Sequence, residues 1–187
     1  MRIETLGIAE VKLLHLRQFG DERGFLSETY NRRRLLEAGI DLVPAQQNHS
    51  FTPRAGTLRG LHFQVPPSAQ GKLVRVPHGA AFDVAVDLRR RSPSYGRHVA
   101  AVLSRAAWNQ LWIPPGFAHG YLTLEPDTEV VYEIDAYYDP NCERGLDWND
   151  PDLGISWPQV AGGPLVADRD RRWPPLANLP DGFPEAG

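Results

Sequence analysis

Short segments in which apolar and polar residues alternate dominate this chain. The clearest alternation places Phe82, Val84, Val86 and Leu88 on one face and Asp83, Ala85 and Asp87 on the other. Such a period of two predicts a β-strand with one apolar face. Further strands are expected at Leu73–Val76, Val99–Leu103, Gln110–Ile113, Gly120–Leu124 and Glu129–Ile134. The turn signal Pro77-His78-Gly79 predicts that segments 73–76 and 82–88 form a hairpin.

One segment has a helical pattern, Arg32–Ala38, with Asn31 as the expected N-cap and Gly39 in the left-handed position after its end. Many short strands with a single helix predict an all-β sandwich or jelly-roll barrel. A parallel α/β fold is disfavoured, because the long crossover helices that it requires are missing.

Length and composition fit one domain spanning residues 1–187, with the segment from about 174 to 187 as an extended C-terminal tail. The net charge of -3 and the pI near 6.1 give no reason to expect nucleic acid or an anionic membrane as partner. No apolar run approaches the roughly 18 residues that span a bilayer, and the N-terminus lacks a secretory signal pattern. Cys142 is the only cysteine, so no intrachain disulfide forms; a cytoplasmic location is expected.

The segment Leu58–Gln64 carries the first candidate chemistry, because it contains Arg59 and His62. Histidine titrates near physiological pH and is the usual general base. Arginine binds phosphate or carboxylate through its planar fork. The pair predicts a site that binds an anion and moves a proton, although a lone histidine is more often structural.

Three further residues have more than one interpretation each. Lys72 is a solvated charge at a strand edge or a stabiliser of an oxyanion inside the barrel. Tyr132 is a core tyrosine or a phenol that donates a proton. Asp83 faces solvent, a second sheet or a polar lumen, and the sequence does not decide among these.

The segment Pro114–Gly120 contains the Pro-x-Gly-x-x-His pattern, ending at His119, that resembles the second motif of cupins. The histidine pair and glutamate of the first cupin motif are absent, which favours a site without metal over a metal enzyme. The chain also lacks dinucleotide-binding, Walker and nucleophile-elbow motifs.

Several ordered motifs together resemble the dTDP-4-dehydrorhamnose 3,5-epimerase family over nearly the whole chain. They are Asp21–Gly24, Gln46–Ser50, Leu58–Gln64, Pro66–Val76, Ile113–Gly120, Tyr138, Glu143–Gly145 and Trp148–Pro151. The resemblance implies a cupin-type jelly roll (a double-stranded β-helix) and a homodimer that exchanges N-terminal elements. It implies no cofactor and no metal.

The reaction implied by the resemblance is epimerisation at C3 and C5 of dTDP-4-dehydro-6-deoxy-D-glucose, giving dTDP-4-dehydro-L-rhamnose, in dTDP-L-rhamnose biosynthesis. Both carbons flank the C4 ketone, so removal of either proton gives an enolate with its charge on the C4 oxygen. Such chemistry needs a base on one face of the sugar, an acid on the other and a cation near the oxygen.

By resemblance, the catalytic residues are His62 as base, Tyr132 as acid, Lys72 at the enolate and Asp170 as the partner of the histidine. Arg59 and Arg23, the latter from the partner subunit, are expected at the pyrophosphate. Other substrate-binding residues are expected at Glu28, Gln46, Asn48, His119, Tyr138, Glu143 and Arg169.

One departure affects the pairing carboxylate. The family commonly shows Leu-Ser-x-Lys-Asp near the C-terminus, whereas this chain reads Val166-Ala167-Asp168-Arg169-Asp170, so either Asp168 or Asp170 pairs with His62. Two related activities also remain open: epimerisation at C3 or C5 alone in another dTDP-deoxysugar pathway, and a 3,4-ketoisomerase-like reaction on the same fold.

Overall fold

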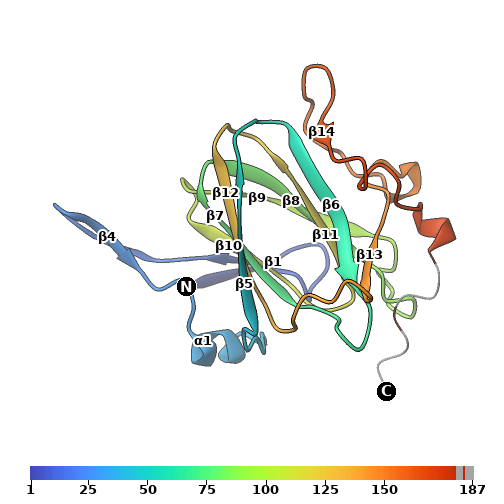
Figure 1. Ribbon diagram of the computed structural model, residues 1–187. Helices are drawn as coiled ribbons and strands as arrows, with labels where there is room; N and C mark the ends of the chain where they lie inside the picture. The colour runs from blue at the N-terminus through green and yellow to red at the C-terminus, as the bar shows by residue number, and fades with distance from the viewer. Residues whose placement is uncertain (180–182, 184–187) are drawn as a thin grey trace.

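The computed structural model describes residues 1–179 and 183, and in this part of the chain two β-sheets pack face to face as a jelly roll (Figure 1). The first sheet has the strand order β1-β2-β10-β7-β12-β5 and the second the order β13-β6-β11-β8-β9, with β14 parallel to β6. The first sheet contains β1 (Arg2–Thr5), β2 (Lys12–His15), β5 (Gln46–Thr52), β7 (Lys72–His78), β10 (Asn109–Ile113) and β12 (Thr128–Ile134). The second contains β6 (Thr57–Gln64), β8 (Ala80–Asp87), β9 (His98–Ser104), β11 (Phe117–Thr123), β13 (Glu143–Gly145) and β14 (Leu165–Val166).

The expected fold class, strands and helix are confirmed, with shifts at their ends. Helix α1 spans Arg32–Glu37, the Asn31 side chain accepts a hydrogen bond from the backbone N–H of Arg34 at 3.2 Å, and Gly39 has φ +72°. No helix among the described residues is long and apolar enough to cross a membrane.

The predicted hairpin is wrong. β7 and β8 follow each other in the chain but lie in different sheets, so the turn between them is a corner from one sheet to the other. Gly79 has φ +75° at this corner, and a Cβ there would lie 2.4 Å from the hydroxyl of Thr128. The chain therefore has no room for a side chain at this position.

Strand β8 is buried on both faces, which the alternation pattern did not predict. Val84 and Val86 pack on the outer face of their sheet, against Leu146 and Leu153 from the C-terminal third of the chain. The other face, which carries Asp83 and Ala85, points into the barrel; both side chains are fully buried. Val84 and Val86 thus pack against the C-terminal third of the chain, which covers this sheet, and Asp83 and Ala85 face the interior of the barrel.

The prediction of an extended C-terminal tail is wrong for the part that the structure describes, which packs against the second sheet. A short 3-10 helix, Leu176–Asn178, lies against the second sheet, and its first backbone N–H donates to Asp150 at 2.7 Å. Another 3-10 helix, Pro151–Leu153, precedes it. Residues 180–182 and 184–187 of the predicted tail lie outside the described residues.

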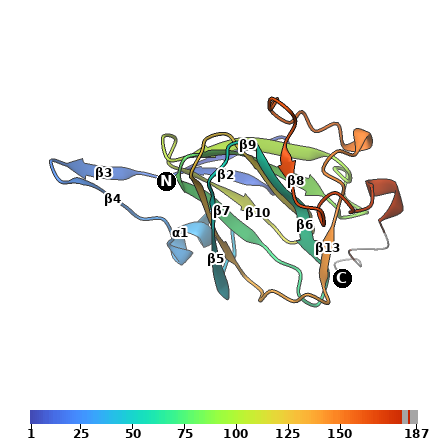
Figure 2. The same cartoon turned by 45° about the horizontal axis from the view of Figure 1, so that its top comes forward.

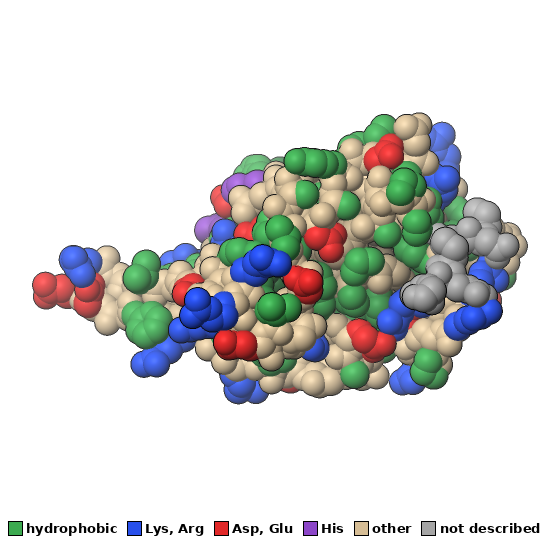
Figure 3. Space-filling view, turned by 90° about the horizontal axis from the view of Figure 1, so that it is seen from below, with side chains coloured by type: hydrophobic (Ala, Val, Ile, Leu, Met, Phe, Trp, Pro, Cys, Tyr) green, Lys and Arg blue, Asp and Glu red, His purple; other side chains and the backbone are tan. Residues whose placement is uncertain are grey.

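A two-stranded arm, β3 (Gln18–Asp21) and β4 (Gly24–Ser27), projects from the body (Figures 1 and 2). Charged side chains crowd its tip, and apolar side chains lie along its middle (Figure 3). Three of these apolar side chains, Phe19, Phe25 and Leu26, are exposed by 42% or more in the single chain.

Candidate active site

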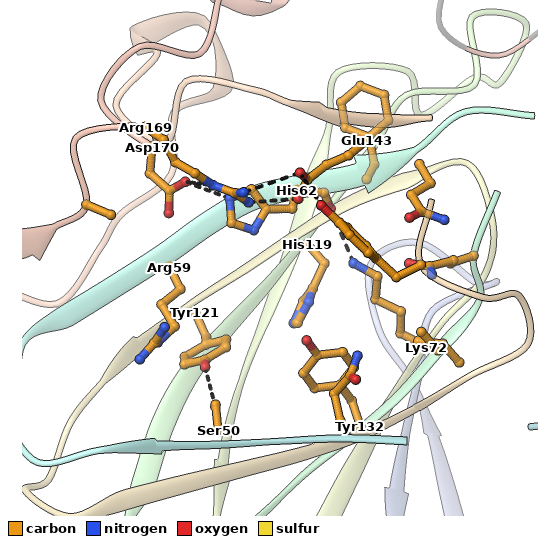
Figure 4. Close-up of a pocket in the computed structure, with 17 residues that line it drawn as sticks. Ser50, Arg59, His62, Lys72, His119, Tyr121, Tyr132, Glu143, Arg169 and Asp170 are labelled. Atoms are coloured by element: carbon orange, nitrogen blue, oxygen red, sulfur yellow. Dashed lines mark hydrogen bonds and ion pairs between the residues drawn. The ribbon is translucent and has the colours of Figure 1, made fainter. Parts of the chain in front are cut away.

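A cavity of about 330 Å³ lies between the two sheets, and most of the predicted site residues line it. His62 and Arg59 enter from β6, His119 from β11, Lys72 from β7 and Tyr132 from β12 (Figure 4). Residues far apart in sequence therefore meet because the facing strands of a jelly roll enclose one space.

A β-bulge explains why Arg59 and His62 both reach this cavity. Residues three apart in a regular strand point to opposite faces. Here Arg59 is paired with Tyr121 and His62 with His119, so β6 has one residue more than β11 between the two pairs. Such an extra residue turns the strand and redirects a side chain.

Two glycines permit this close approach. Gly60 has φ +122°, and a Cβ on it would lie 2.7 Å from the Cα of Gly120. A Cβ on Gly120 would in turn lie 2.8 Å from the carbonyl oxygen of Arg59. The predicted role of the segment 58–64 thus depends on backbone that only glycine fits.

His62 is paired with Asp170. The Nε2 atom of His62 lies 2.7 Å from Oδ1 of Asp170, while Oδ2 accepts from the backbone N–H of Gly60 at 3.1 Å. The indole N–H of Trp173 donates to Oδ1 at 3.3 Å. Burial alone would raise the pKa of Asp170, but these donors, His62 first, lower it to about 2.

The sequence left open whether Asp168 or Asp170 pairs with His62. In the structure the partner is Asp170, and the neighbouring Asp168 is exposed. β14 brings this segment to the cavity, because it pairs in parallel with β6 from Thr57 to Leu58. An ionised carboxylate accepts hydrogen bonds only, so Nε2 of His62 carries the proton and Nδ1 is the free base in the neutral ring.

A second histidine–carboxylate pair lies next to the first. Nε2 of His119 is 3.0 Å from both carboxylate oxygens of Asp83, and both side chains are buried. Burial lowers the pKa of His119 despite the opposing effect of Asp83. The imidazole is therefore neutral at neutral pH. Of the three alternatives that the sequence left for Asp83, the structure shows the polar lumen.

Lys72 is buried beside these pairs, with Nζ 3.3 Å from the backbone carbonyl oxygen of His62. Burial lowers its pKa to about 8, while the charges of Asp83 and Glu143 act in the opposite direction. The ammonium is thus charged at neutral pH but close to its titration point. It is a cation held inside the cavity and not at a solvated strand edge.

Tyr132 lies on the wall opposite His62 (Figure 4). The side chain of Asn48 of β5 is its hydrogen-bond partner, which acts to lower the pKa of the phenol. Burial raises its pKa, so the phenol is protonated at neutral pH. His62 and Tyr132 belong to different sheets, and the cavity separates them.

At one end of the cavity, Glu143 joins two other predicted residues. Its carboxylate accepts from Arg169 at 2.7 Å and from the hydroxyl of Tyr138 at 2.9 Å. Burial would raise the pKa of Glu143, but the hydrogen bonds from Arg169 and Tyr138 outweigh it and lower the pKa. Gln46 does not line the cavity; it donates to Asn48 at 2.8 Å and accepts from the backbone N–H of Tyr138 at 3.1 Å.

Besides Gln46, two predicted residues lie outside this cavity. Arg23 stands at the tip of the β3–β4 arm, is paired with Asp21 and is largely exposed. Glu28 follows the arm and pairs with Arg34 of α1 at 3.0 Å. The cavity of a single chain therefore contains neither residue.

Sequence reasoning missed Tyr121 and Ser50, which also line the cavity. The hydroxyl oxygens of the two side chains are 2.8 Å apart. Strand β5 was not among the predicted strands, because its inward side chains are polar: Gln46, Asn48 and Ser50 alternate with the exposed Gln47, His49 and Phe51. The period of two was present, but with the polar face inward.

Among the described residues, no group of three or more His, Cys, Asp and Glu side chains is arranged to hold a metal ion. The cationic side chains Arg59, Lys72 and Arg169 line the cavity.

The chain matches the family model described as dTDP-4-dehydrorhamnose 3,5-epimerase over residues 5–178. The dTDP-4-dehydrorhamnose 3,5-epimerase of Sinorhizobium fredii is 47% identical over 183 residues, covering 98% of this chain and 93% of the relative.

Solved structures agree with the sequence relatives. A Legionella pneumophila dTDP-6-deoxy-D-glucose-3,5-epimerase in complex with dTDP-4-keto-L-rhamnose is 38% identical, with a TM-score of 0.91, covering 96% of this chain and 94% of that one. A 3'-monoepimerase from Streptomyces bikiniensis in complex with dTDP-quinovose is 32% identical, with a TM-score of 0.86, covering 92% and 87%.

Proposed function

Because this chain belongs to the dTDP-4-dehydrorhamnose 3,5-epimerase family, it is an isomerase, and we propose how its own residues carry out the reaction. The substrate is dTDP-4-dehydro-6-deoxy-D-glucose, and inversion at C3 and C5 gives dTDP-4-dehydro-L-rhamnose for dTDP-L-rhamnose biosynthesis. The observation that carries the assignment is a carboxylate-paired histidine and a protonated phenol on facing sheets of one cavity.

His62 is the base. Asp170 fixes the ring so that the unprotonated nitrogen faces away from the carboxylate, and it stabilises the imidazolium that forms when a proton arrives from C3 or C5. General-base catalysis of this kind contributes about 10²–10⁴ in rate. The ionised state of Asp170 at neutral pH, which follows from its pKa of about 2, supports this role.

Lys72 stabilises the enolate. Removal of either proton transfers charge to the C4 oxygen, and a buried ammonium interacts with that charge more strongly than a solvated one. The burial of Lys72 in the same cavity, beside the backbone of His62, supports this role.

Tyr132 returns the proton on the opposite face. Inversion requires that the proton arrive from the side away from His62, and Tyr132 stands on the facing sheet. Before the second carbon reacts, the phenolate takes a proton from solvent and the imidazolium of His62 releases its proton to solvent.

Arg59 binds the diphosphate as a guanidinium fork. Asn48, His119, Tyr138, Glu143 and Arg169 contact the rest of the substrate from the cavity walls, with Gln46 orienting Asn48. We further propose a homodimer in which the β3–β4 arm carries Arg23 to the diphosphate of the partner's site and Glu28 to its nucleotide. The exposed apolar side chains of the arm support this proposal.

The reaction takes place in the cytoplasm in this proposal. The single cysteine, Cys142, is buried and unpaired, which suits a reducing compartment. The chain needs no cofactor for it, since the ketone itself acidifies both C–H bonds.

The deciding experiment follows deuterium from heavy water into C3 and C5 of the product. We expect label at both carbons with the wild type and none at either with His62→Ala, while dTDP binding by the variant stays close to normal. Label at one carbon only would assign single-site epimerisation, the activity of the Streptomyces bikiniensis relative. Normal exchange by His62→Ala would remove His62 from the role of base.

Tyr132→Phe separates the acid from the base. Exchange by His62 returns the proton to the face from which it came, so the variant loses inversion more than exchange. Equal losses of both would count against Tyr132 as the acid.

A further inference from the structure

The inward side chains of β5 form a polar row that orders the cavity from end to end. Thr52 accepts from Arg59 at 3.4 Å, Ser50 bonds Tyr121 at 2.8 Å, and Asn48 bonds Tyr132. Alternate residues of a strand are roughly 7 Å apart. The row therefore sets its partners in the order Arg59, Tyr121, Tyr132 along the cavity.

The register of the second sheet places Tyr121 at the end of the cavity that holds Arg59. Tyr121 lies opposite Arg59, whereas His119 lies opposite His62. Tyr121 thus lies beside the guanidinium and His119 beside the base, and the Tyr121–Ser50 pair lies on the side of Arg59 that faces Tyr132 (Figure 4).

This position corresponds to one part of the substrate, an inference that rests on the proposed function. Arg59 holds the diphosphate, and His62 and Tyr132 flank the carbons on either side of C4. The sugar atoms between these regions are C1, C2 and the ring oxygen, and of these only C2 carries a hydroxyl. We propose that the Tyr121–Ser50 pair binds the C2 hydroxyl and makes the enzyme selective for 2-hydroxylated over 2-deoxy sugar nucleotides.

The chemistry of the pair fits a sugar hydroxyl. Tyrosine and serine hydroxyls both donate and accept. Ser50 can also donate to the carbonyl oxygen of Val130 at 3.4 Å, and Tyr121 then donates to Ser50 and keeps a lone pair for a donor on the ligand. A hydroxyl supplies that donor, whereas diphosphate oxygens only accept.

Binding of three ligands that do not react tests the inference: dTDP-glucose, dTDP-2-deoxyglucose and dTDP, measured by calorimetry. We expect the wild type to prefer dTDP-glucose over the 2-deoxy compound about tenfold, the effect of one hydrogen bond. Tyr121→Phe keeps the ring but removes the hydroxyl, so the preference falls to about one while dTDP binds as before. Ser50→Ala reduces the preference by a smaller factor.

Tyr138→Phe is the matched control, because Tyr138 is also a cavity phenol but bonds Glu143. It should retain the preference. A wild type without the preference, or a Tyr121→Phe variant that keeps it, overturns the inference. So does an equal loss for all three ligands, since that would assign Tyr121 to the diphosphate.

The binding assay is independent of turnover. If the wild type discriminates between the two sugars but incorporates no deuterium, the proposed reaction fails and the C2 subsite stands. If it incorporates deuterium at both carbons but does not discriminate, the reaction stands and the subsite fails.

Discussion

Two histidine–carboxylate pairs lie side by side in the cavity, and they differ in access more than in chemistry. His119 and Asp83 sit on neighbouring strands of one sheet, with side chains 6% and 0% exposed. His62 keeps 26% of its side chain exposed, and its partner Asp170 comes from the segment that follows β14.

The difference shows that a histidine–carboxylate pair does not by itself identify a base. In the buried pair, burial lowers the pKa of the imidazole, and the carboxylate of Asp83 opposes the lowering of the pKa of Lys72. The open pair leaves one face of His62 toward the cavity. We infer that the first pair sets the electrostatics of the site and the second moves protons.

Asp170→Asn should have the largest effect. An amide beside His62 favours the wrong tautomer and cannot stabilise the imidazolium, so deuterium exchange at both carbons should fall by about 10⁴, as for the same change in a Ser-His-Asp triad. Asp168→Asn is the control, because that neighbour is exposed, and it should retain near-normal exchange. The reverse result would make Asp168 the functional carboxylate.

Asp83→Asn should act on Lys72 and not on the base. Loss of the carboxylate removes a charge that raises the pKa of Lys72. The alkaline limb of the pH–rate profile should therefore move to lower pH, with a loss of about twofold at pH 7 for a fall of one unit in the pKa of Lys72. An unmoved limb, with a uniform loss at every pH, would mean that Asp83 acts through packing alone.

The alkaline limb itself should come from Lys72. Its pKa of about 8 means that roughly a tenth of the molecules carry the ammonium at pH 9, so kcat should fall about tenfold between pH 7 and 9. Lys72→Arg keeps the cation at all these pH values, so its profile should stay flat there, although the altered geometry lowers kcat. A limb that persists in this variant belongs to another group.

The smallest effect is on stability in acid. The pKa of Asp170 is lowered from 3.8 to about 2, so its contribution to stability is complete above about pH 4 and is lost as pH falls through 2. The contribution amounts to roughly 2 kcal/mol. Denaturant unfolding of the wild type and Asp170→Asn should show a gap in stability at pH 6 that narrows by about this amount toward pH 2; a gap independent of pH would contradict it.

The sequence by itself determined much of the framework. Alternation predicted strands whose one face is apolar, as in β8 and β12, and Asn31 with Gly39 marked the ends of α1. It failed for β5, because strands that line a polar cavity carry their polar residues inward. It also failed for the connection at Gly79, since a local turn signal does not say whether the next strand joins the same sheet.

The site divides in the same way. The residue types in the segment 58–64 and the family motifs identified Arg59, His62, Lys72 and Tyr132 as candidates. Only the tertiary structure decided that Asp170 and not Asp168 meets His62, that Asp83 faces the lumen, and that Tyr121 and Ser50 line it. Each of these contacts depends on a β-bulge, on the parallel pairing of β14 with β6, or on the packing of one sheet against the other. These features bring together residues up to 108 positions apart. Local sequence encodes the period of a strand, but the packing of two sheets decides what each face meets.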